Sequence, residues 1–329
     1  MTDTNDRLRV AVCDDYQRVA LKMADWSRLG PDVDIEVFDR PLGDGAADAL
    51  RDFDVVCLMR ERMAVPRSLI ERLPRLRFVA VTGSHADVVD KAACDERGIG
   101  VRLTSPAASA SAAEHAWALV LALARHVVVE DRNMREGRWQ TTVGLRLQGL
   151  TLGLLGLGAL GAKVARYGQA FDMNVLAWSA NLTAEAAAAS GAKLVPKEEL
   201  LRCSDVVSVQ LKLSDRTRGL IGAAELASMK PGALLINTSR GPIVNEAALI
   251  EALRDGRIGG AGLDVFDREP LPVDHPLRAC PNTVLTPHIG FVTEQGYRAF
   301  FEGIVELILD WRRSVANARG AIAPRDGTL

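Results

Sequence analysis

The stretch TLGLLGLGALG at residues 151–161 is an apolar run followed by a glycine-rich turn. Gly156, Gly158 and Gly161 give it the spacing GxGxxG. In this pattern the first glycine permits a tight turn and the second lets the backbone approach a pyrophosphate. The third lets a helix pack closely on the preceding strand. The apolar run before the glycines and the helical pattern after them predict a strand–turn–helix unit that binds dinucleotide phosphates at the helix N-terminus.

Alternating strand and helix patterns continue from this unit toward the C-terminus. The apolar runs predict strands at Thr151–Leu155, Asn174–Trp178, Asp205–Leu211, Ala233–Asn237, Gly260–Val265 and Thr283–Leu285. Helical patterns lie between them at about Leu160–Phe171, Ala184–Ser190, Ala223–Met229 and Asn245–Arg254. Gly191 and Gly256 stand where helix C-termini favour a positive φ. Strands joined by helical crossovers indicate a doubly wound parallel sheet.

The N-terminal part of the chain shows the same alternation. Its apolar runs predict strands at Arg9–Cys13, Asp34–Phe38, Asp54–Leu58, Phe78–Val81 and Gly98–Val101, with a helix at Ser68–Leu73. A long helix is expected next, capped by Ser109 or Ser111 and continuing to Arg135. A last helix is expected over Glu294–Arg313. The sequence therefore predicts an α/β protein with two sheets.

Composition narrows the class of protein. The chain has 329 residues, of which 48% are hydrophobic and 25% are charged, as in ordinary globular proteins of about two domains. A formal net charge of -2 argues against nucleic acid and anionic membranes as partners. The N-terminus lacks the pattern of a signal peptide, and the longest apolar run, Ala116–Ala124, is too short to span a bilayer. Five dispersed cysteines argue against a disulfide scaffold, and no spacing indicates a metal site. We expect a cytoplasmic protein.

Polar side chains follow three of the predicted strands in the second half of the chain. Arg240 follows Ala233–Asn237, Glu269 lies just beyond Gly260–Val265, and His288 follows Thr283–Leu285. Because ligands of doubly wound sheets bind beyond the carboxyl ends of the strands, we expect these side chains to meet at one rim.

These three residue types suit the reduction of a 2-oxo acid. Arg240 offers a planar fork of donors to a carboxylate and a carbonyl. His288 can deliver a proton, because histidine changes charge near neutral pH. Glu269 can bond the other ring nitrogen, orient the imidazole and favour its charged form. Asp264, at the end of a predicted strand, is a candidate to bond the nicotinamide carboxamide of a cofactor.

The end of the second strand of this unit bears on the choice of cofactor. A carboxylate there would bond the ribose 2′-OH of NAD, but no acid follows Trp178 until Glu185. Ser179 and Asn181 can instead hydrogen-bond a 2′-phosphate, although no arginine stands beside them. The sequence therefore predicts NAD(P)(H) binding with a modest preference for NADP(H).

Taken together, these motifs resemble the D-isomer-specific 2-hydroxyacid dehydrogenases. The matching stretches are AEH at 113–115, residues 149–161, MKPG at 229–232, INTSRG at 236–241, AGLDVF at 261–266, EP at 269–270 and LTPH at 285–288. The resemblance is strong over about residues 75–292. It implies a homodimeric NAD(P)-dependent enzyme in which Arg240, Glu269 and His288 are catalytic. The expected cofactor-contacting residues are Gly156, Gly158, Ala159, Leu160, Gly161, Ser179, Asn181, Leu211, Thr217, Thr238, Ser239, Asp264 and Gly290.

The resemblance also implies the domain organisation. Two Rossmann-like or flavodoxin-like domains with doubly wound parallel sheets are expected, with the cofactor domain, residues 105–286, inserted into a discontinuous substrate domain formed by residues 1–104 and 287–329. In such enzymes a backbone loop of the substrate domain holds the substrate carboxylate. The matching residues here are Thr82, Gly83, Ser84 and His85. Many members have glycine near position 85, so substrate identity stays open, and His85 either contacts substrate or shapes the loop.

The leading hypothesis is an oxidoreductase that interconverts a small 2-oxo acid, such as glyoxylate or hydroxypyruvate, and the D-2-hydroxy acid. One alternative is a related dehydrogenase that acts on formate or phosphite. Formate dehydrogenases have glutamine where Glu269 stands, which makes the formate hypothesis less favoured. A second alternative is a dinucleotide-sensing corepressor, which would keep the glycine loop but would need a surface that binds peptides.

Overall fold

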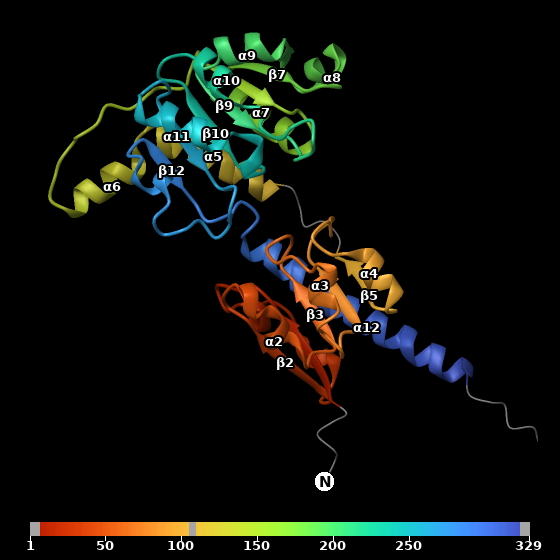
Figure 1. Ribbon diagram of the computed structural model, residues 1–329. Coiled ribbons are helices and arrows are strands. Elements are labelled where there is room, and N and C mark those ends of the chain that lie inside the picture. Colours follow the sequence, from red (N-terminus) through yellow and green to blue (C-terminus); the bar gives the residue numbers. More distant parts are fainter. Residues whose placement is uncertain (1–6, 105–109, 323–329) are drawn as a thin grey trace, which may run out of the picture. The chain divides into compact units, whose positions relative to one another are not determined.

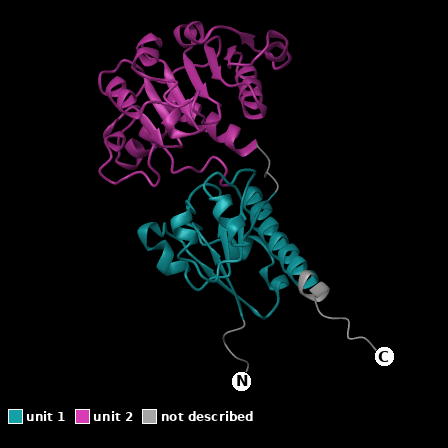
Figure 2. Ribbon diagram, turned by 45° about the vertical axis from the view of Figure 1, so that its right-hand side comes forward, with its two compact units in different colours: residues 1–108, 293–329 teal, residues 109–292 magenta. Residues whose placement is uncertain are grey.

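The computed structural model describes residues 7–104 and 110–322 of the chain. It divides into two compact units: unit 1 comprises residues 1–108 and 293–329, and unit 2 comprises residues 109–292 (Figure 2). Both boundaries lie a few residues further along the chain than the sequence suggested. Residues 287–292 stay with unit 2 because their backbone is hydrogen-bonded to Asp264 within that unit.

Unit 1 contains a parallel five-stranded sheet (Figure 1). Its strands are β1 (Leu8–Val12), β2 (Val33–Val37), β3 (Val55–Leu58), β4 (Phe78–Val81) and β5 (Gly100–Leu103). Their order, β2-β1-β3-β4-β5, is flavodoxin-like. Strands β3 and β4 are buried along their whole length, as expected for central strands covered on both faces. The helices are α1 (Ala20–Met23), α2 (Ala46–Leu50), α3 (Arg67–Ile70), α4 (Lys91–Glu96) and α12 (Glu294–Ile322), with 3-10 turns η1 (Trp26–Leu29) and η2 (Gly43–Gly45).

Helix α12 brings the C-terminal part of the chain back to unit 1. Its apolar side chains Phe300, Phe301 and Ile308 are buried. The ring of Trp311 stacks on Phe78 of β4 with centroids 5.1 Å apart. This apolar burial explains why unit 1 is discontinuous in sequence, since each fully buried side chain of this size contributes about 1.5–3 kcal/mol.

Unit 2 contains a parallel seven-stranded sheet in the order β12-β11-β10-β9-β6-β7-β8. The strands are β6 (Thr151–Leu155), β7 (Asn174–Trp178), β8 (Lys193–Leu194), β9 (Val206–Val209), β10 (Leu234–Asn237), β11 (Gly260–Leu263) and β12 (Thr283–Leu285). The helices are α5 (Ala110–Ala124), α6 (Val127–Arg135), α7 (Ala159–Ala170), α8 (Ala184–Ala189), α9 (Lys197–Cys203), α10 (Ala223–Ser228) and α11 (Glu246–Arg254), with 3-10 turns η3 (Gly241–Ile243) and η4 (Pro276–Ala279). The chain reverses its direction of travel across the sheet between β6 and β9. The predicted class, α/β with two doubly wound parallel sheets, is confirmed.

The prediction of one long helix ending at Arg135 was wrong. The helix breaks between α5 and α6, which are bent by 60°. His126 lies between them with φ 52°. In a continuous helix the carbonyl of Ala124 would accept the N–H of the residue four positions further along the chain. Here it accepts the N–H of Leu145 instead. A tertiary hydrogen bond thus replaces a helical one.

Other differences lie at element ends. Helix α5 begins at Ala110, so Ser111 lies inside the helix rather than capping it, and Ser109 is outside the described residues. The sequence patterns did not predict strand β8 or helix α9. Helix α12 is longer than predicted. Among the described residues no single helix is long and apolar enough to cross a membrane, although α5 and α6 together reach that composition.

Candidate active site

The glycine-rich turn joins β6 to α7, at the point where β6 and β9 are adjacent. Gly156 has φ +102°, and a Cβ there would lie 2.5 Å from the carbonyl oxygen of Gln210. A Cβ on Gly161 would lie 2.3 Å from the carbonyl oxygen of Gly156. These two glycines are therefore required by the fold itself, because a side chain at either position would collide with backbone.

Gly158 differs from the other two glycines of the motif. It precedes α7 with φ -75°, and within residues 7–104 and 110–322 no atom beyond its chain neighbours lies within 4 Å of the place that its Cβ would occupy. No side chain of the described residues caps the helix start, so within this part of the chain the first backbone N–H groups of α7 have no side-chain acceptor. Open space above uncapped N–H groups is what a phosphate needs at a helix N-terminus. The residues of this turn therefore fit the pyrophosphate of a dinucleotide.

The turn after β7 contains the residues expected to contact the adenosine ribose. Ser179 is half-buried, Asn181 is exposed, and the N–H of Leu182 closes the turn on the carbonyl of Ser179. The next acid along the chain, Glu185, lies in the first turn of α8. The turn thus presents hydroxyl and amide groups without a carboxylate of its own.

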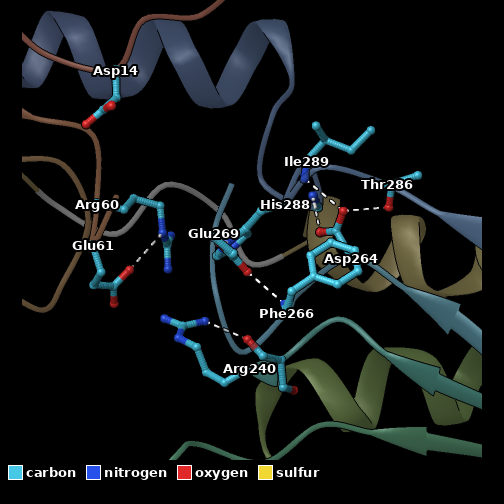
Figure 3. Close-up of polar contacts among 12 residues, drawn as sticks. Asp14, Arg60, Glu61, Arg240, Asp264, Phe266, Glu269, Thr286, His288 and Ile289 are labelled. Carbon is cyan, nitrogen blue, oxygen red and sulfur yellow. Dashed lines mark hydrogen bonds and ion pairs between the residues drawn. The ribbon is translucent and has the colours of Figure 1, made fainter. Parts of the chain in front are cut away.

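Arg240 stands at the carboxyl end of β10, in a turn that is held by side chains. The side-chain amide of Asn237 donates to the carbonyl of Arg240, and its oxygen accepts the N–H of Ser239. The hydroxyl of Ser239 donates to the carbonyl of Val209 on the neighbouring strand. Arg240 itself donates from Nη1 to the carbonyl of Ser239, at 2.7 Å. These bonds fix the position from which the guanidinium extends (Figure 3).

The turn of Arg240 packs directly on the segment that carries Glu269. A Cβ on Gly241 would lie 2.1 Å from the carbonyl carbon of Phe266, so the two backbones are in contact there. The N–H of Phe266 donates to Oε1 of Glu269 at 2.9 Å, which fixes that carboxylate (Figure 3). The carboxyl ends of β10 and β11 are thereby joined at one edge of the sheet.

His288 and Glu269 are hydrogen-bonded to each other at this edge. Nδ1 of His288 lies 2.7 Å from Oε2 of Glu269, and the side chains are 21% and 33% exposed. His288 has φ 54°, and its N–H donates to the carbonyl of Thr286. Since Glu269 takes Nδ1, the imidazole presents Nε2 as the nitrogen for a ligand. The chain thus brings together the histidine and glutamate that the sequence pointed to.

Asp264 holds the backbone beside His288. Its carboxylate is only 1% exposed and accepts the N–H groups of Ile289 and Gly290, both at 2.8 Å, and the hydroxyl of Thr286 at 2.6 Å. Burial raises the pKa of Asp264, but the hydrogen bonds to His115, Thr286 and Ile289 outweigh this effect and leave it below the ordinary value. A Cβ on Gly290 would lie 3.1 Å from this carboxylate. The contact of Asp264 with a carboxamide stays a prediction.

His115 completes this network from helix α5. Its Nε2 lies 2.9 Å from Oγ1 of Thr286 and 3.2 Å from Oδ1 of Asp264. In the sequence, His115 stands out only as part of the AEH stretch at 113–115. Its partners lie far along the chain, so spacing alone could not reveal the contact. The structure makes His115 a positioning residue for the segment that carries His288.

Three other residues expected to contact the cofactor lie in loops of unit 2 and make different contacts there. Leu211 lies beside the glycine turn, since its Cδ2 would be 3.1 Å from a Cβ on Gly156. The hydroxyl of Thr217 closes its own loop by donating to the carbonyl of Lys212 and accepting from Ser214. Thr238 is half-buried in the turn after β10. Cofactor contacts by these residues stay predictions.

The loop expected to hold a substrate carboxylate belongs to unit 1 and follows β4. Thr82 is buried, and its hydroxyl accepts the N–H of Arg60. The N–H of Gly83 is donated to Oγ1 of Thr104 at 2.9 Å, so this amide is already used within the unit. Ser84 is exposed and His85 half-buried, and neither donates its N–H to a partner within residues 7–104 and 110–322. The N–H groups of Thr82 and Gly83 are thus already bonded, whereas those of Ser84 and His85 are not bonded within the described residues, and substrate contacts by this loop stay a prediction.

Known proteins resemble this chain over most of its length. The sequence profile of the D-isomer specific 2-hydroxyacid dehydrogenase, NAD binding domain, matches residues 117–290. A glyoxylate reductase of Aeropyrum pernix is 40% identical over 275 residues, which are 80% of this chain and 82% of that protein.

A D-3-phosphoglycerate dehydrogenase of Archaeoglobus fulgidus is 39% identical over 240 residues, which are 72% of this chain and 46% of that longer protein. The solved structure of a phosphoglycerate oxidoreductase from Vibrio cholerae has a TM-score of 0.88 and 31% identity, and covers 93% of this chain and 99% of that one.

Proposed function

The chain belongs to the D-isomer specific 2-hydroxyacid dehydrogenase family, and we propose that it reduces a small 2-oxo acid to the D-2-hydroxy acid with His288 as the proton donor. Membership makes it an oxidoreductase that uses a nicotinamide dinucleotide. The observation that carries the assignment of roles is the pair formed by His288 and Glu269, which stands on the same sheet edge as Arg240 and the glycine turn.

The residues at this edge divide the chemistry between them. A bound nicotinamide dinucleotide supplies the hydride for the substrate carbon, so the protein must supply one proton to the carbonyl oxygen. His288 gives that proton from Nε2, and Glu269 stabilises the ring through Nδ1 at 2.7 Å. Arg240 binds the substrate carboxylate and polarises the carbonyl. In the direction of oxidation the imidazole accepts the proton of the hydroxyl instead.

The substrate carboxylate is also proposed to accept N–H groups from Ser84 and His85. Both N–H groups lack another acceptor within the described residues, whereas the N–H of Gly83 is bonded to Thr104. The relatives named above act on glyoxylate and on 3-phosphoglycerate, so the substituent on the 2-oxo acid is the open part of the substrate.

The cofactor is proposed to be NADP(H) in modest preference to NAD(H). This rests on the turn after β7, where Ser179 and Asn181 stand and no carboxylate follows until Glu185. Hydroxyl and amide groups can donate to a 2′-phosphate, and the absence of a nearby carboxylate in this turn removes a repulsion.

The protein is further proposed to act as a homodimer in the cytoplasm. Helix α6 and the extended segment after it stand away from the sheet of unit 2 (Figure 1), and the dimer is supported by the exposed apolar residues of this part of the chain. The exposed ones are Val127, Val128, Val129, Met134, Trp139, Val143 and Leu145, with Val143 93% exposed. A run of exposed apolar side chains in one segment of the chain is typical of an interface between subunits. Sedimentation of the purified protein would test this, and a monomer at micromolar concentration would contradict it.

The reaction is tested with a panel of substrates. Glyoxylate, hydroxypyruvate, pyruvate and 3-phosphohydroxypyruvate are each supplied with NADPH and with NADH, and formate and phosphite with the oxidised cofactors. We expect at least one 2-oxo acid to be reduced, with D configuration in any chiral product. Tight cofactor binding without turnover of any acid would instead support a sensor, and turnover of formate or phosphite alone would contradict the proposed reaction.

A further inference from the structure

Two arginines, Arg60 and Arg62, follow β3 at the carboxyl edge of the unit 1 sheet, and Arg60 lies beside the loop of residues 82–85. Arg60 follows β3, which is paired with β4, and it has φ 54°. Its N–H donates to Oγ1 of Thr82 at 2.9 Å. The stem and guanidinium of Arg60 lie across Gly83, because a Cβ there would be 3.7 Å from Nη1 and 3.9 Å from Cγ. The charge of Arg60 is therefore one residue from the amides proposed to hold the substrate.

Each arginine has an acid beside it. Nε of Arg60 lies 3.6 Å from Oε2 of Glu61, and the two side chains are 26% and 22% exposed (Figure 3). Arg62 donates to the backbone carbonyl of Asp14 and lies over the ring of Tyr16, at 4.6 Å from its centroid. The buried carboxylate of Asp14 accepts the hydroxyl of Tyr16. Burial raises the pKa of Asp14, while Tyr16 and Arg62 lower it.

This arrangement has consequences for a substrate substituent. A phosphate group carries nearly two negative charges. It therefore needs positive side chains nearby that outnumber the negative side chains paired with them. A hydroxymethyl group or a hydrogen atom needs only hydrogen-bond partners and no net charge. Partly buried charges within a few ångströms of a ligand are screened much less than exposed ones. The sign of the charge beside the loop therefore affects which 2-oxo acids bind.

We propose that Glu61 is a specificity-determining residue: by pairing with Arg60 beside residues 82–85, it removes the surplus positive charge that a phosphorylated substrate would require. The enzyme then favours 2-oxo acids whose substituent is uncharged. This inference rests on the proposed function, because it assumes that the loop holds the substrate carboxylate.

The test uses two substrates that differ only in a phosphoryl group, hydroxypyruvate and 3-phosphohydroxypyruvate. The wild type should have the higher kcat/KM for hydroxypyruvate. Glu61→Gln should raise the ratio of kcat/KM for the phosphorylated acid to that for hydroxypyruvate by about tenfold, as expected for one charge near a dianion. The increase should shrink in high salt. Glu61→Asp, which keeps the charge, should stay close to the wild type.

A matched control removes an acid of the same charge elsewhere in unit 1. Glu36 lies on β2 and pairs with Arg9 at 3.5 Å, so Glu36→Gln changes the net charge equally and should leave the ratio unchanged. The double variant Arg60→Gln/Glu61→Gln should return the ratio to the wild-type value, because both charges of the pair are gone. If Glu61→Gln does not fold, the inference is tested by the kcat/KM ratios of the double variant and of the wild type.

The inference would be overturned by a wild type that prefers the phosphorylated acid, or by a ratio that Glu61→Gln leaves unchanged. An equal rise in Glu36→Gln would also overturn it, since the effect would then be one of net charge. A wild type that reduces no 2-oxo acid at all would instead refute the proposed function, so the two failures are distinguishable.

Discussion

Nδ1 of His288 lies 2.7 Å from Oε2 of Glu269, while Oε1 of the same carboxylate accepts the N–H of Phe266. The carboxylate is thus held by backbone on one side and orients an imidazole with the other. His288 has φ 54°, which places its backbone in the left-handed region that residues other than glycine rarely adopt. Because Glu269 contacts Nδ1, Nε2 is the ring nitrogen left for the proposed proton transfer.

Glu269→Gln should lower kcat by roughly tenfold or more, because a neutral amide cannot give the imidazolium the charge-assisted hydrogen bond that the carboxylate gives it. The amide oxygen can still accept the N–H of Phe266, so the backbone should keep its place. The measurement is steady-state kinetics alongside the affinity for the oxidised cofactor, which should stay unchanged. Wild-type kcat in this variant would show that the carboxylate has no part in turnover.

Gly158→Ala should weaken cofactor binding by at least about tenfold without lowering the stability of the free protein. Its Cβ would meet no protein atom within 4 Å, so only a bound pyrophosphate would be obstructed. Cofactor titration and thermal unfolding of the free protein measure the two effects. Gly161→Ala is the comparison variant. Its Cβ would lie 2.3 Å from a backbone oxygen, so this substitution should lower the unfolding temperature. Unchanged cofactor affinity in Gly158→Ala would place the pyrophosphate elsewhere.

Asp264→Asn should lower the free energy of unfolding at pH 7 by about 2–4 kcal/mol. An amide at this position would turn a donor toward the N–H groups of Ile289 and Gly290 or the hydroxyl of Thr286. The measurement is urea unfolding of both proteins at several pH values. A difference within experimental error at pH 7 would contradict the role of Asp264 as an anchor.

The pH dependence of this effect has a definite sign. The folded-state pKa of Asp264 lies below the ordinary value of 3.8, so the unfolded chain binds the proton more readily. The stabilisation is therefore complete above about pH 4 and is lost as the pH falls through the lowered pKa. The gap between the wild type and Asp264→Asn should narrow in that window. Asp267 is the contrast, because burial and the nearby Glu246 raise its pKa. Asp267→Asn should not lower stability at pH 7.

Ser179→Asp should shift the cofactor preference toward NADH by about tenfold or more. A carboxylate in the turn after β7 would accept the ribose 2′-OH of NADH and repel the 2′-phosphate of NADPH. The ratio of kcat/KM for the two reduced cofactors is the measure. A wild type with a strong preference for NADH would already contradict the assignment of Ser179 and Asn181.

Much of the fold could be predicted from local sequence patterns. The apolar runs of the central strands and the GxGxxG turn each have a local physical cause, namely burial on both faces and close backbone approach. Even Gly191 and Gly256 could be placed at helix ends, and both have positive φ. The positions of Arg240, Glu269 and His288 followed because parallel strands end at one edge of a sheet.

The remainder depends on contacts between distant residues. The break at His126 arises because Leu145 takes the carbonyl of Ala124. Strand β8 has only two residues, too few for any alternation to be visible. The sequence could not show that the N–H of Gly83 is bonded to Thr104, which follows another strand, and the role of Gly83 in binding substrate stays a prediction. His115 likewise gains its meaning only from Asp264 and Thr286.

The central claim is that His288 donates the proton, and the variant His288→Asn tests it most directly. Asparagine tolerates the left-handed backbone at this position, so the segment held by Asp264 should keep its form. The measurement is single-turnover reduction of the preferred 2-oxo acid with saturating reduced cofactor. The account predicts a rate lower by about 10²–10⁴-fold with cofactor affinity unchanged. A rate close to that of the wild type would contradict it.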